Sequence, residues 1–515
     1  MFAPFANEPH ADFRQEGPRR RMREALERVG AALGRTYPLV IGGQPVETAD
    51  SLVSRNPACP SQVVGITGRA TPEHIDRAIQ AAAQAYPEWS RTPPEVRARC
   101  LVKAAAILRR RIYEFSAWMV YEVSKSWTEA YADAAEAIDF LEFYARQMVR
   151  LAGQRETTHF PGEEAEVQYL PLGVGGIISP WNFPLAIFTG MTAGPVVAGN
   201  TVVCKPAEQS PVLAALCFQV LEEASLPPGV VNFVPGFGED AGEALTGDPR
   251  IRFVSFTGSK AVGLRIYERV AQARPSQHWL KRAVLEMGGK NAIIVDETAD
   301  LDAAAEGVVA SAFGFQGQKC SACSRLIAHE RIHDALLERV VQRAAALKVG
   351  DPANPETDMG AVIDEDAMRK ILSYIEIGRG EGELVLGGEP LPGEGHFVPP
   401  TLFVNVAPGA RIAQEEIFGP VLAVLRAADF DEALEIANGT EYGLTGAVYS
   451  RDRSRLERAR REFHVGNLYF NRKCTGALVD VQPFGGFNMS GTDSKAGGRD
   501  YLLLFLQQKA ISERW

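Results

Sequence analysis

The sequence predicts an α/β protein with two units, each built on a mainly parallel sheet with helices on both faces. Two observations carry this prediction. From residue 171 onward, short apolar runs such as VGGIIS, TVVCKP, VVNFVPG and RFVSFTGS alternate with helical stretches such as VLAALCFQVLEEA. A second series, NAIIVD, SRLIAH, GPVLAVLR and GAVYS, follows with its own helices. Continuous apolar strands separated by helices are typical of parallel sheets covered on both faces.

The elements before these two series are mainly helical. Acidic residues are interspersed among the arginines of residues 1–30, and no apolar stretch accompanies them, so we expect no export signal there. Residues 1–37 are interpreted as an N-terminal helical extension. From Pro72 to Gln147 the apolar spacing is helical, with Thr71 as the expected N-cap.

One apolar stretch resembles a membrane span in length. Residues 167–204 contain no charged side chain, but four prolines and many glycines interrupt them, so no continuous helix could cross a bilayer. We therefore interpret the stretch as buried strands and a tight loop, and expect no membrane partner. The first unit is predicted to comprise residues 38–150 and 171–285, and the second residues 286–483. Residues 151–170 and 484–515 are predicted to form short paired strands that mediate assembly.

Composition narrows the class of protein. With 515 residues, of which 46% are hydrophobic and 23% charged, the chain can bury a large core without disulfides or a structural metal. The net charge of −10 argues against a nucleic-acid partner. The seven cysteines show no disulfide spacing, which fits a reducing compartment, and we expect a cytoplasmic protein.

Two short motifs match known signatures weakly. Residues 236–241 fit GxGxxA after a strand, but the expected acidic residue about twenty positions later is missing, so a glycine-rich strand-to-helix turn is favoured over a dinucleotide site. Residues 329–333 fit the HExxH of zinc peptidases, whose two histidines must share one helix face. Because SRLIAH is a predicted strand and a helix is expected to begin near His333, the motif straddles a junction. We expect no metal site.

Three pieces make chemical sense together. Cys320 in FQGQKCSA supplies a thiol, Glu286 in LEMGGK a carboxylate beside two glycines, and Asn182 in PWNFP an amide between two prolines. A thiolate nucleophile, a base for water and a rigid amide donor are the requirements of acyl transfer through a thioester. Cys320 and Cys323 also form a CxxC, which leaves two interpretations of Cys323: a buried spectator, or a partner of Cys320 in an oxidised disulfide.

The chain resembles the aldehyde dehydrogenase superfamily from about residue 38 onward. The matching stretches, in the family's order and spacing, are PWNFP, KPAEQSP, FTGSKAVG, LEMGGKNAIIV, GQKCSA, EEIFGPV, YGLTGAV and PFGGFNMSG. The FANEPH opening and the segment from FHVGN to SKAGG are most similar to the branch that oxidises L-glutamate γ-semialdehyde in proline catabolism. The resemblance implies a Rossmann-type NAD-binding domain, an α/β catalytic domain and a small β oligomerisation arm.

The resemblance also implies roles for individual residues. Cys320 would be the nucleophile, Asn182 would stabilise the oxyanion and Glu286 would activate water. Lys205 and Glu208 would hold the adenine ribose of NAD. The other positions assigned to the cofactor are Ile178, Ser179, Pro180, Trp181, Gly258, Ser259, Gly288, Glu416 and Phe418. Core packing is the alternative interpretation of Trp181 and Phe418.

For the substrate, the resemblance assigns Glu136, Phe183, Lys319, Ser321, Gly476, Ala477 and Phe484. Lys319 would contribute positive charge for the α-carboxylate, although a surface lysine would explain it too. Oxidation of another ω-semialdehyde or a simple aldehyde stays open, as do a zinc peptidase and a non-catalytic scaffold, whereas Glu286 disfavours a CoA-acylating enzyme. Expected partners are a second copy of the chain and a separate proline dehydrogenase, since 515 residues leave no room for a fused one.

Overall fold

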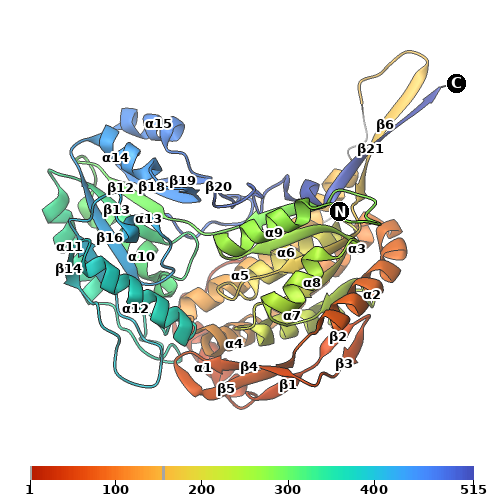
Figure 1. The fold of residues 1–515 in the computed structure, drawn as a ribbon, viewed down its shortest axis with the longest axis horizontal. Coiled ribbons are helices and arrows are strands. Elements are labelled where there is room, and N and C mark those ends of the chain that lie inside the picture. The colour runs from red at the N-terminus through yellow and green to blue at the C-terminus, as the bar shows by residue number, and fades with distance from the viewer. Residues whose placement is uncertain (1–2, 154–156, 515) are drawn as a thin grey trace.

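The computed structural model describes residues 3–153 and 157–514. Two seven-stranded sheets lie side by side in the body of the molecule, and a two-stranded ribbon projects from it (Figure 1). The predicted α/β class with two mainly parallel sheets is confirmed.

The first sheet has the strand order β11-β10-β7-β8-β9-β2-β3, and β7 to β11 run parallel through it. Ile177 of β7 belongs to one core and Ile178 to another, because successive side chains of a strand point to opposite faces. The strands are β2 (Leu39–Ile41), β3 (Gln44–Val46), β7 (Val174–Ile178), β8 (Thr201–Lys205), β9 (Val231–Phe233), β10 (Ile251–Thr257) and β11 (Arg282–Glu286).

Helices cover both faces of this sheet. One core is shared with α2 (Pro72–Arg91), α8 (Glu243–Gly247) and α9 (Lys260–Ala271). The other is shared with α3 (Pro94–Arg110), α5 (Trp127–Ala152), α6 (Ala186–Val197) and α7 (Pro211–Glu223). Thr71 precedes α2, and its backbone N–H donates to His74 Nδ1 at 3.1 Å, which confirms the predicted helix start. The charge-free stretch 167–204 is divided among β6 (Glu163–Pro171), β7, α6 and β8, and no described helix is long and apolar enough to cross a membrane.

The second sheet has the order β14-β15-β16-β13-β12-β18-β19 and is parallel except for the β14–β15 pair. Its strands are β12 (Asn291–Val295), β13 (Cys323–His329), β14 (Glu383–Leu386), β15 (Thr401–Val404), β16 (Val421–Ala427), β18 (Thr445–Tyr449) and β19 (Asn467–Phe470). Its helices are α10 (Leu301–Phe313), α11 (His333–Ala345), α12 (Glu365–Arg379), α13 (Arg411–Gln414), α14 (Phe430–Asn438) and α15 (Arg453–Glu462).

The remaining elements surround these sheets. A three-stranded sheet contains β1 (Arg35–Tyr37), β5 (Cys59–Gly68) and β4 (Ser51–Asn56), and β17 (Tyr442–Gly443) pairs with β20 (Phe487–Asn488). Helix α1 (Glu16–Gly30) contacts α4 (Ile112–Val123), whereas residues 3–12 contain no helix or strand. The projecting ribbon pairs β6 (Glu163–Pro171) antiparallel with β21 (Leu506–Arg514) (Figure 1).

Candidate active site

A cavity of ≈ 420 Å³ lies where the two sheets meet, and it brings together residues that are far apart in the sequence. Glu286 ends β11 of the first sheet, and Cys320 lies in the loop before β13 of the second. Both line the cavity. Its wall also contains every residue that the sequence assigned to the substrate, namely Glu136, Phe183, Lys319, Ser321, Gly476, Ala477 and Phe484.

The loop that carries Cys320 is held in an unusual backbone conformation. Phe315 and Gln316 have φ values of 51° and 57°, in the left-handed region that side chains other than glycine rarely adopt. The Gln316 amide donates to the carbonyls of Ser124 at 3.0 Å and Ala361 at 2.8 Å, which fixes this turn. Burial raises the pKa of the Cys320 thiol, and the carboxylates of Glu416 and Glu286 raise it further. The thiol therefore needs a base to become a nucleophile.

Glu286 has the properties of such a base. Its Oε1 accepts a hydrogen bond from the Ser494 hydroxyl at 2.5 Å, and its buried Oε2 has no partner among the described residues. Burial raises the pKa of the Glu286 carboxyl to about 8, although the bonds from Ser494 oppose this shift. The carboxyl can therefore exchange a proton near neutral pH inside a cavity that it shares with the thiol.

Asn182 follows β7 and is tied to the nucleophile loop. Its Nδ2 donates to the carbonyl of Gln318 at 3.0 Å, two residues before Cys320. A primary amide has two N–H groups, so the second remains for another acceptor. The Cys320 carbonyl accepts from Asn291 Nδ2 at 2.7 Å, and the same amide holds the Ala322 carbonyl at 2.8 Å. These bonds fix the loop on both sides of the thiol.

Lys205 and Glu208 lie at the end of β8. Lys205 Nζ donates to the carbonyls of Gly236 at 2.8 Å and Pro206 at 3.0 Å, and lies 3.6 Å from the Glu208 carboxylate. Burial lowers the pKa of Lys205. Glu208 lines a second pocket of ≈ 370 Å³ together with Phe237, so its carboxylate is accessible to a ligand.

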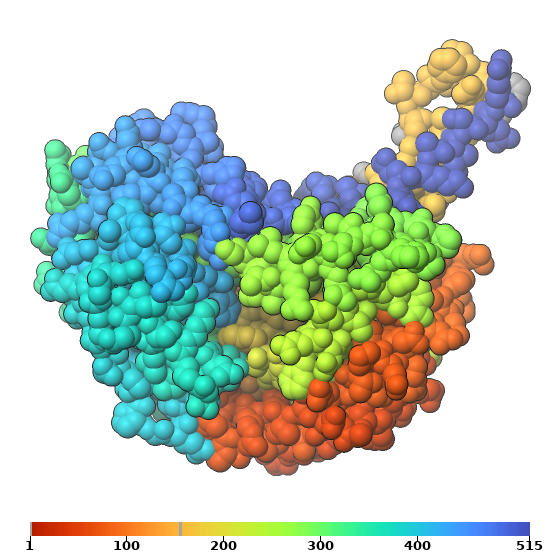
Figure 2. All heavy atoms as spheres, viewed as in Figure 1, coloured from red at the N-terminus to blue at the C-terminus, as the bar shows by residue number. Residues whose placement is uncertain are grey.

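Gly258 and Ser259 connect β10 to α9. Ser259 is the N-cap of α9, and its hydroxyl accepts from the Val262 N–H at 3.4 Å. The N-terminus of a helix presents unpaired N–H groups and a partial positive charge, which suit a phosphate. Figure 2 shows a hollow between the green surface around α9 and the teal surface around α12.

Glu416 and Phe418, which the sequence analysis assigned to the cofactor, lie beside the nucleophile loop. The Gly289 N–H donates to Glu416 Oε1 at 3.0 Å, and a Cβ on Gly288 would lie 2.2 Å from the Glu416 carboxylate. Trp181 and Phe418 make an edge contact with ring centroids 5.6 Å apart. This contact is compatible with both interpretations that the sequence left open for the two rings. Ile178, Ser179 and Pro180 lie at the end of β7 and in the loop that follows it, just before Trp181 and Asn182.

Among the charged side chains that line the cavity, Lys319 differs from the sequence prediction. Lys319 is neither a surface lysine nor a free cation, because its Nζ donates to Glu129 Oε1 at 2.6 Å. Lys473, Arg472 and His10 line the same cavity, and sequence reasoning missed all three. Lys473 and Arg472 stand directly before CTGA, so proximity to that motif was an available signal.

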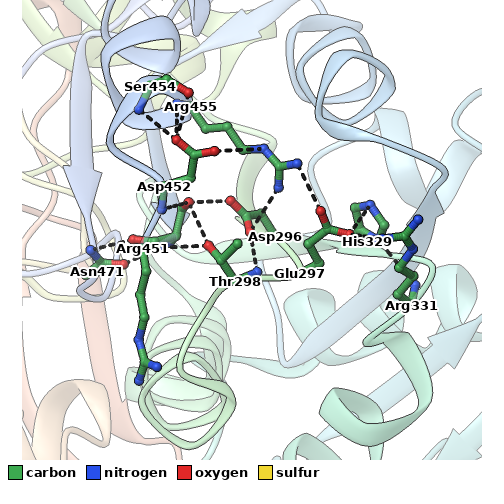
Figure 3. A network of polar contacts seen from close by, with 11 residues as sticks. Asp296, Glu297, Thr298, His329, Arg331, Arg451, Asp452, Ser454, Arg455 and Asn471 are labelled. Atoms are coloured by element: carbon green, nitrogen blue, oxygen red, sulfur yellow. Dashed lines mark hydrogen bonds and ion pairs between the residues drawn. The ribbon is translucent and has the colours of Figure 1, made fainter.

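The two weak motifs have structural roles. His329 ends β13 and α11 begins at His333, so the predicted junction inside HExxH is confirmed. His329 Nε2 lies 3.2 Å from Glu297, whose carboxylate also binds Arg331 and Arg455 (Figure 3). Among the described residues, no three histidine, cysteine or acidic side chains cluster as metal ligands would.

The GxGxxA match runs from the loop after β9 into a short π-helix at Gly238–Gly242, and its Gly236 carbonyl accepts a hydrogen bond from Lys205. Cys323 of the CxxC points to the Arg325 carbonyl at 3.4 Å and contacts Cys474, whereas Cys320 lines the cavity. All seven cysteines are free thiols in this structure. A disulfide between Cys320 and Cys323 under oxidation stays a prediction.

Residues 46–511 match the model of the aldehyde dehydrogenase family, and the chain belongs to this family. It is 58% identical over 513 residues to a protein of Geobacillus kaustophilus named 1-pyrroline-5-carboxylate dehydrogenase, with 100% of both chains covered. A crystal structure of 1-pyrroline-5-carboxylate dehydrogenase from Thermus with bound NAD matches with a TM-score of 0.99, 58% identity and full coverage of both chains. Proline utilization A from Bdellovibrio bacteriovorus matches with a TM-score of 0.98 and 45% identity, over 99% of this chain and 53% of that one.

Proposed function

We propose that this chain oxidises L-glutamate γ-semialdehyde, the open form of Δ1-pyrroline-5-carboxylate, to L-glutamate with NAD, in proline catabolism. The observation that carries the proposal is the single cavity that holds Cys320, Glu286 and both acidic and basic side chains. The names of the similar proteins from Geobacillus kaustophilus and Thermus support the same substrate.

The first step follows from the state of the thiol. Cys320 Sγ attacks the aldehyde carbon, and its proton passes to the unpartnered Oε2 of Glu286. The former carbonyl oxygen becomes an oxyanion, which accepts from the second N–H of Asn182 Nδ2 and from the Cys320 backbone N–H. One such donor contributes about 3–4 kcal/mol to transition-state stabilisation. When bound, NAD supplies the ring that accepts the hydride, which leaves the acyl group on Sγ as a thioester.

The second step needs water and a base. Glu286 gives up its proton to solvent and then takes one from a water molecule, whose oxygen attacks the thioester carbon. The C–S bond breaks, the thiol is restored, and the carboxylic acid leaves the cavity. Because the pKa of Glu286 is raised to about 8, this carboxyl can take and release protons near neutral pH.

The residues present fit the dinucleotide. The Glu208 carboxylate would accept hydrogen bonds from a ribose 2′-hydroxyl and would repel a 2′-phosphate, so NAD is preferred to NADP. Lys205 would support the same ribose. The N-terminus of α9 at Gly258 and Ser259 would hold the pyrophosphate. Gly288 has no side chain, which leaves room for the Glu416 carboxylate, and this carboxylate would bind the nicotinamide ribose. Phe418 and the chain from Ile178 to Trp181 would line the site of the nicotinamide ring.

The substrate presents an α-carboxylate and an α-ammonium group at the end away from the aldehyde. The backbone of Gly476 and Ala477 and the hydroxyl of Ser321 would bind the carboxylate, with Lys319 and Lys473 supplying positive charge. Glu136 would face the ammonium group. Phe183 and Phe484 would enclose the aliphatic carbons between the two ends.

The ribbon formed by β6 and β21 supports a homo-oligomer, at least a dimer, because an isolated two-stranded ribbon is marginal without further contacts. Free thiols fit a cytoplasmic enzyme. The substrate would come from a proline dehydrogenase.

The test compares reduction of NAD on glutamate semialdehyde, succinate semialdehyde and propanal. We expect kcat/KM to be about a hundredfold higher for glutamate semialdehyde, since groups built to bind a polar end reject substrates that lack it. Equal values for glutamate semialdehyde and propanal would overturn the proposed substrate.

A further inference from the structure

The N-terminal segment, residues 3–13, forms part of the wall of the substrate cavity. His10 of this segment lines the cavity. Aromatic contacts hold the segment on α5 at both ends: the Phe5 ring lies 5.2 Å from Phe143, and the Phe13 ring lies 5.5 Å from Trp127. Because both ends are anchored by packing, a polar side chain between them can be changed without detaching the segment.

Asn7 joins the two elements that enclose the charged end of the cavity. Its Nδ2 donates to Asp139 Oδ2 of α5 at 2.9 Å and to the carbonyl of Val479 at 3.1 Å. The Glu8 N–H donates to the other Asp139 oxygen at 2.7 Å. Both N–H groups of the Asn7 amide are therefore used to hold α5 and the loop of residues 476–479 at a fixed separation.

This separation matters for the substrate because both joined elements line the cavity. Val479 and Asp139 belong to its wall, and Val479 lies two residues after Ala477. Asp139 is only 4% exposed, and burial raises the pKa of its carboxyl to about 6, whereas the bonds from Asn7 and Glu8 and the charge of Arg109 favour its charged form. Among the described residues of this segment, only Asn7 has hydrogen bonds to both Asp139 and Val479.

We propose that Asn7 is a positioning residue that determines specificity for an aldehyde with an α-amino acid end. It keeps the loop of residues 476–479 at a fixed distance from α5. At this distance, the backbone N–H groups of Gly476 and Ala477 can bind the α-carboxylate of a substrate whose aldehyde carbon lies at Cys320. An aldehyde without that carboxylate does not use these groups. The inference rests on the proposed function.

The test is the Asn7→Ala variant of the full chain, with Arg14→Ala as the matched control. Arg14 is in the stretch that follows the segment, its side chain is 91% exposed, and it pairs with Asp12 away from the cavity. For Asn7→Ala we expect KM for glutamate semialdehyde to rise about tenfold, because the loss of one hydrogen bond to a charged group has an effect of this size. We expect kcat for it, and kcat/KM for propanal, to change less than twofold.

Equilibrium binding gives a readout independent of turnover. By calorimetry, the Kd of L-glutamate should rise about tenfold in Asn7→Ala, while the Kd of NAD stays unchanged. Asn7→Ser retains one donor for Asp139 but cannot also reach Val479, so it should reproduce the effect if Asn7→Ala folds poorly. Equal losses on both aldehydes, or an unchanged ratio, would overturn the inference. A wild-type enzyme that oxidises propanal but not glutamate semialdehyde would instead overturn the proposed function.

Discussion

Replacing Glu286 by glutamine keeps the size of the side chain and removes its ability to take a proton. Glutamine retains a carbonyl oxygen that can accept the Ser494 hydroxyl at the position of Oε1, so we expect Glu286→Gln to fold. The wild-type carboxyl has a pKa raised to about 8 by burial. A base with this pKa is about one-tenth ionised at pH 7 and about nine-tenths ionised at pH 9, so wild-type kcat should rise about tenfold across that interval.

The variant should lose the second step more than the first. Burial still raises the pKa of the Cys320 thiol in the variant, but the substitution removes one of the two carboxylates that raise it further, and a thiol is a far stronger acid than water, so Cys320 loses its proton to solvent more readily than the hydrolytic water does. In stopped-flow absorbance at pH 9, we expect a burst of about one NADH per site. The steady phase should be slower than wild type by about 10² or more. Equal losses in both phases, or a variant whose kcat still rises with pH, would refute this role.

The same substitution has a consequence for stability. The folded-state pKa of Glu286 is raised, so between pH 4.5 and about 8 the folded protein binds more protons than the unfolded chain. Wild-type stability therefore falls as pH rises through this window, and the glutamine variant lacks this loss. The Tm difference between variant and wild type should grow from pH 5 to pH 8, and a constant difference would contradict the assigned pKa.

Three further outcomes follow from the site. Glu208→Gln removes a carboxylate that repels the 2′-phosphate of NADP. The ratio of kcat/KM for NADP to kcat/KM for NAD should therefore rise about tenfold. An unchanged ratio would show that Glu208 does not contact the ribose. In Gly288→Ala, the new Cβ would displace the Glu416 carboxylate, so KM for NAD should rise about tenfold while L-glutamate binding by calorimetry is retained. Dialysis against EDTA should leave kcat unchanged, since His329 and His333 lie in different elements; a loss restored by zinc would contradict this.

Local pattern predicted the strands because each parallel strand is apolar on both faces. Ile177 and Ile178 are adjacent and belong to different cores, which is why VGGII is a continuous apolar run. The three-stranded sheet of β1, β5 and β4 had no such signal, because its burial pattern is mixed and its strands are short or partly exposed. Antiparallel β2, which lies between β9 and the edge strand β3, also depends on pairing with β9, a partner nearly two hundred residues away.

The motifs predicted Cys320, Glu286 and the substrate-assigned residues that line the cavity, but not what each side chain contacts there. The contact from Ser494 to Glu286 spans 208 residues and depends on how the chain after β19 returns to the first sheet. Similarly, the CxxC spacing could not show that Cys323 begins β13 and contacts Cys474. The neighbours that a strand's side chains contact depend on the sheet that the strand joins. Contacts of this kind leave no local periodicity in a single sequence.

The ion pair between Lys319 and Glu129, which the sequence did not predict, affects which substrates the cavity selects. A cation that is already bound to a carboxylate attracts an anionic substrate less than a free one, so Lys319 alone is a weak anchor. The cavity instead combines Lys319, Lys473 and Arg472 with Glu129 and Glu136; burial raises the pKa of Glu136 to about 8, and a bound ammonium group would favour its charged form. Such a mixed set matches a zwitterion, whose carboxylate and ammonium each find the opposite charge. A plain aldehyde would leave all of these groups without a ligand, and a purely anionic semialdehyde would leave the acidic ones unmatched.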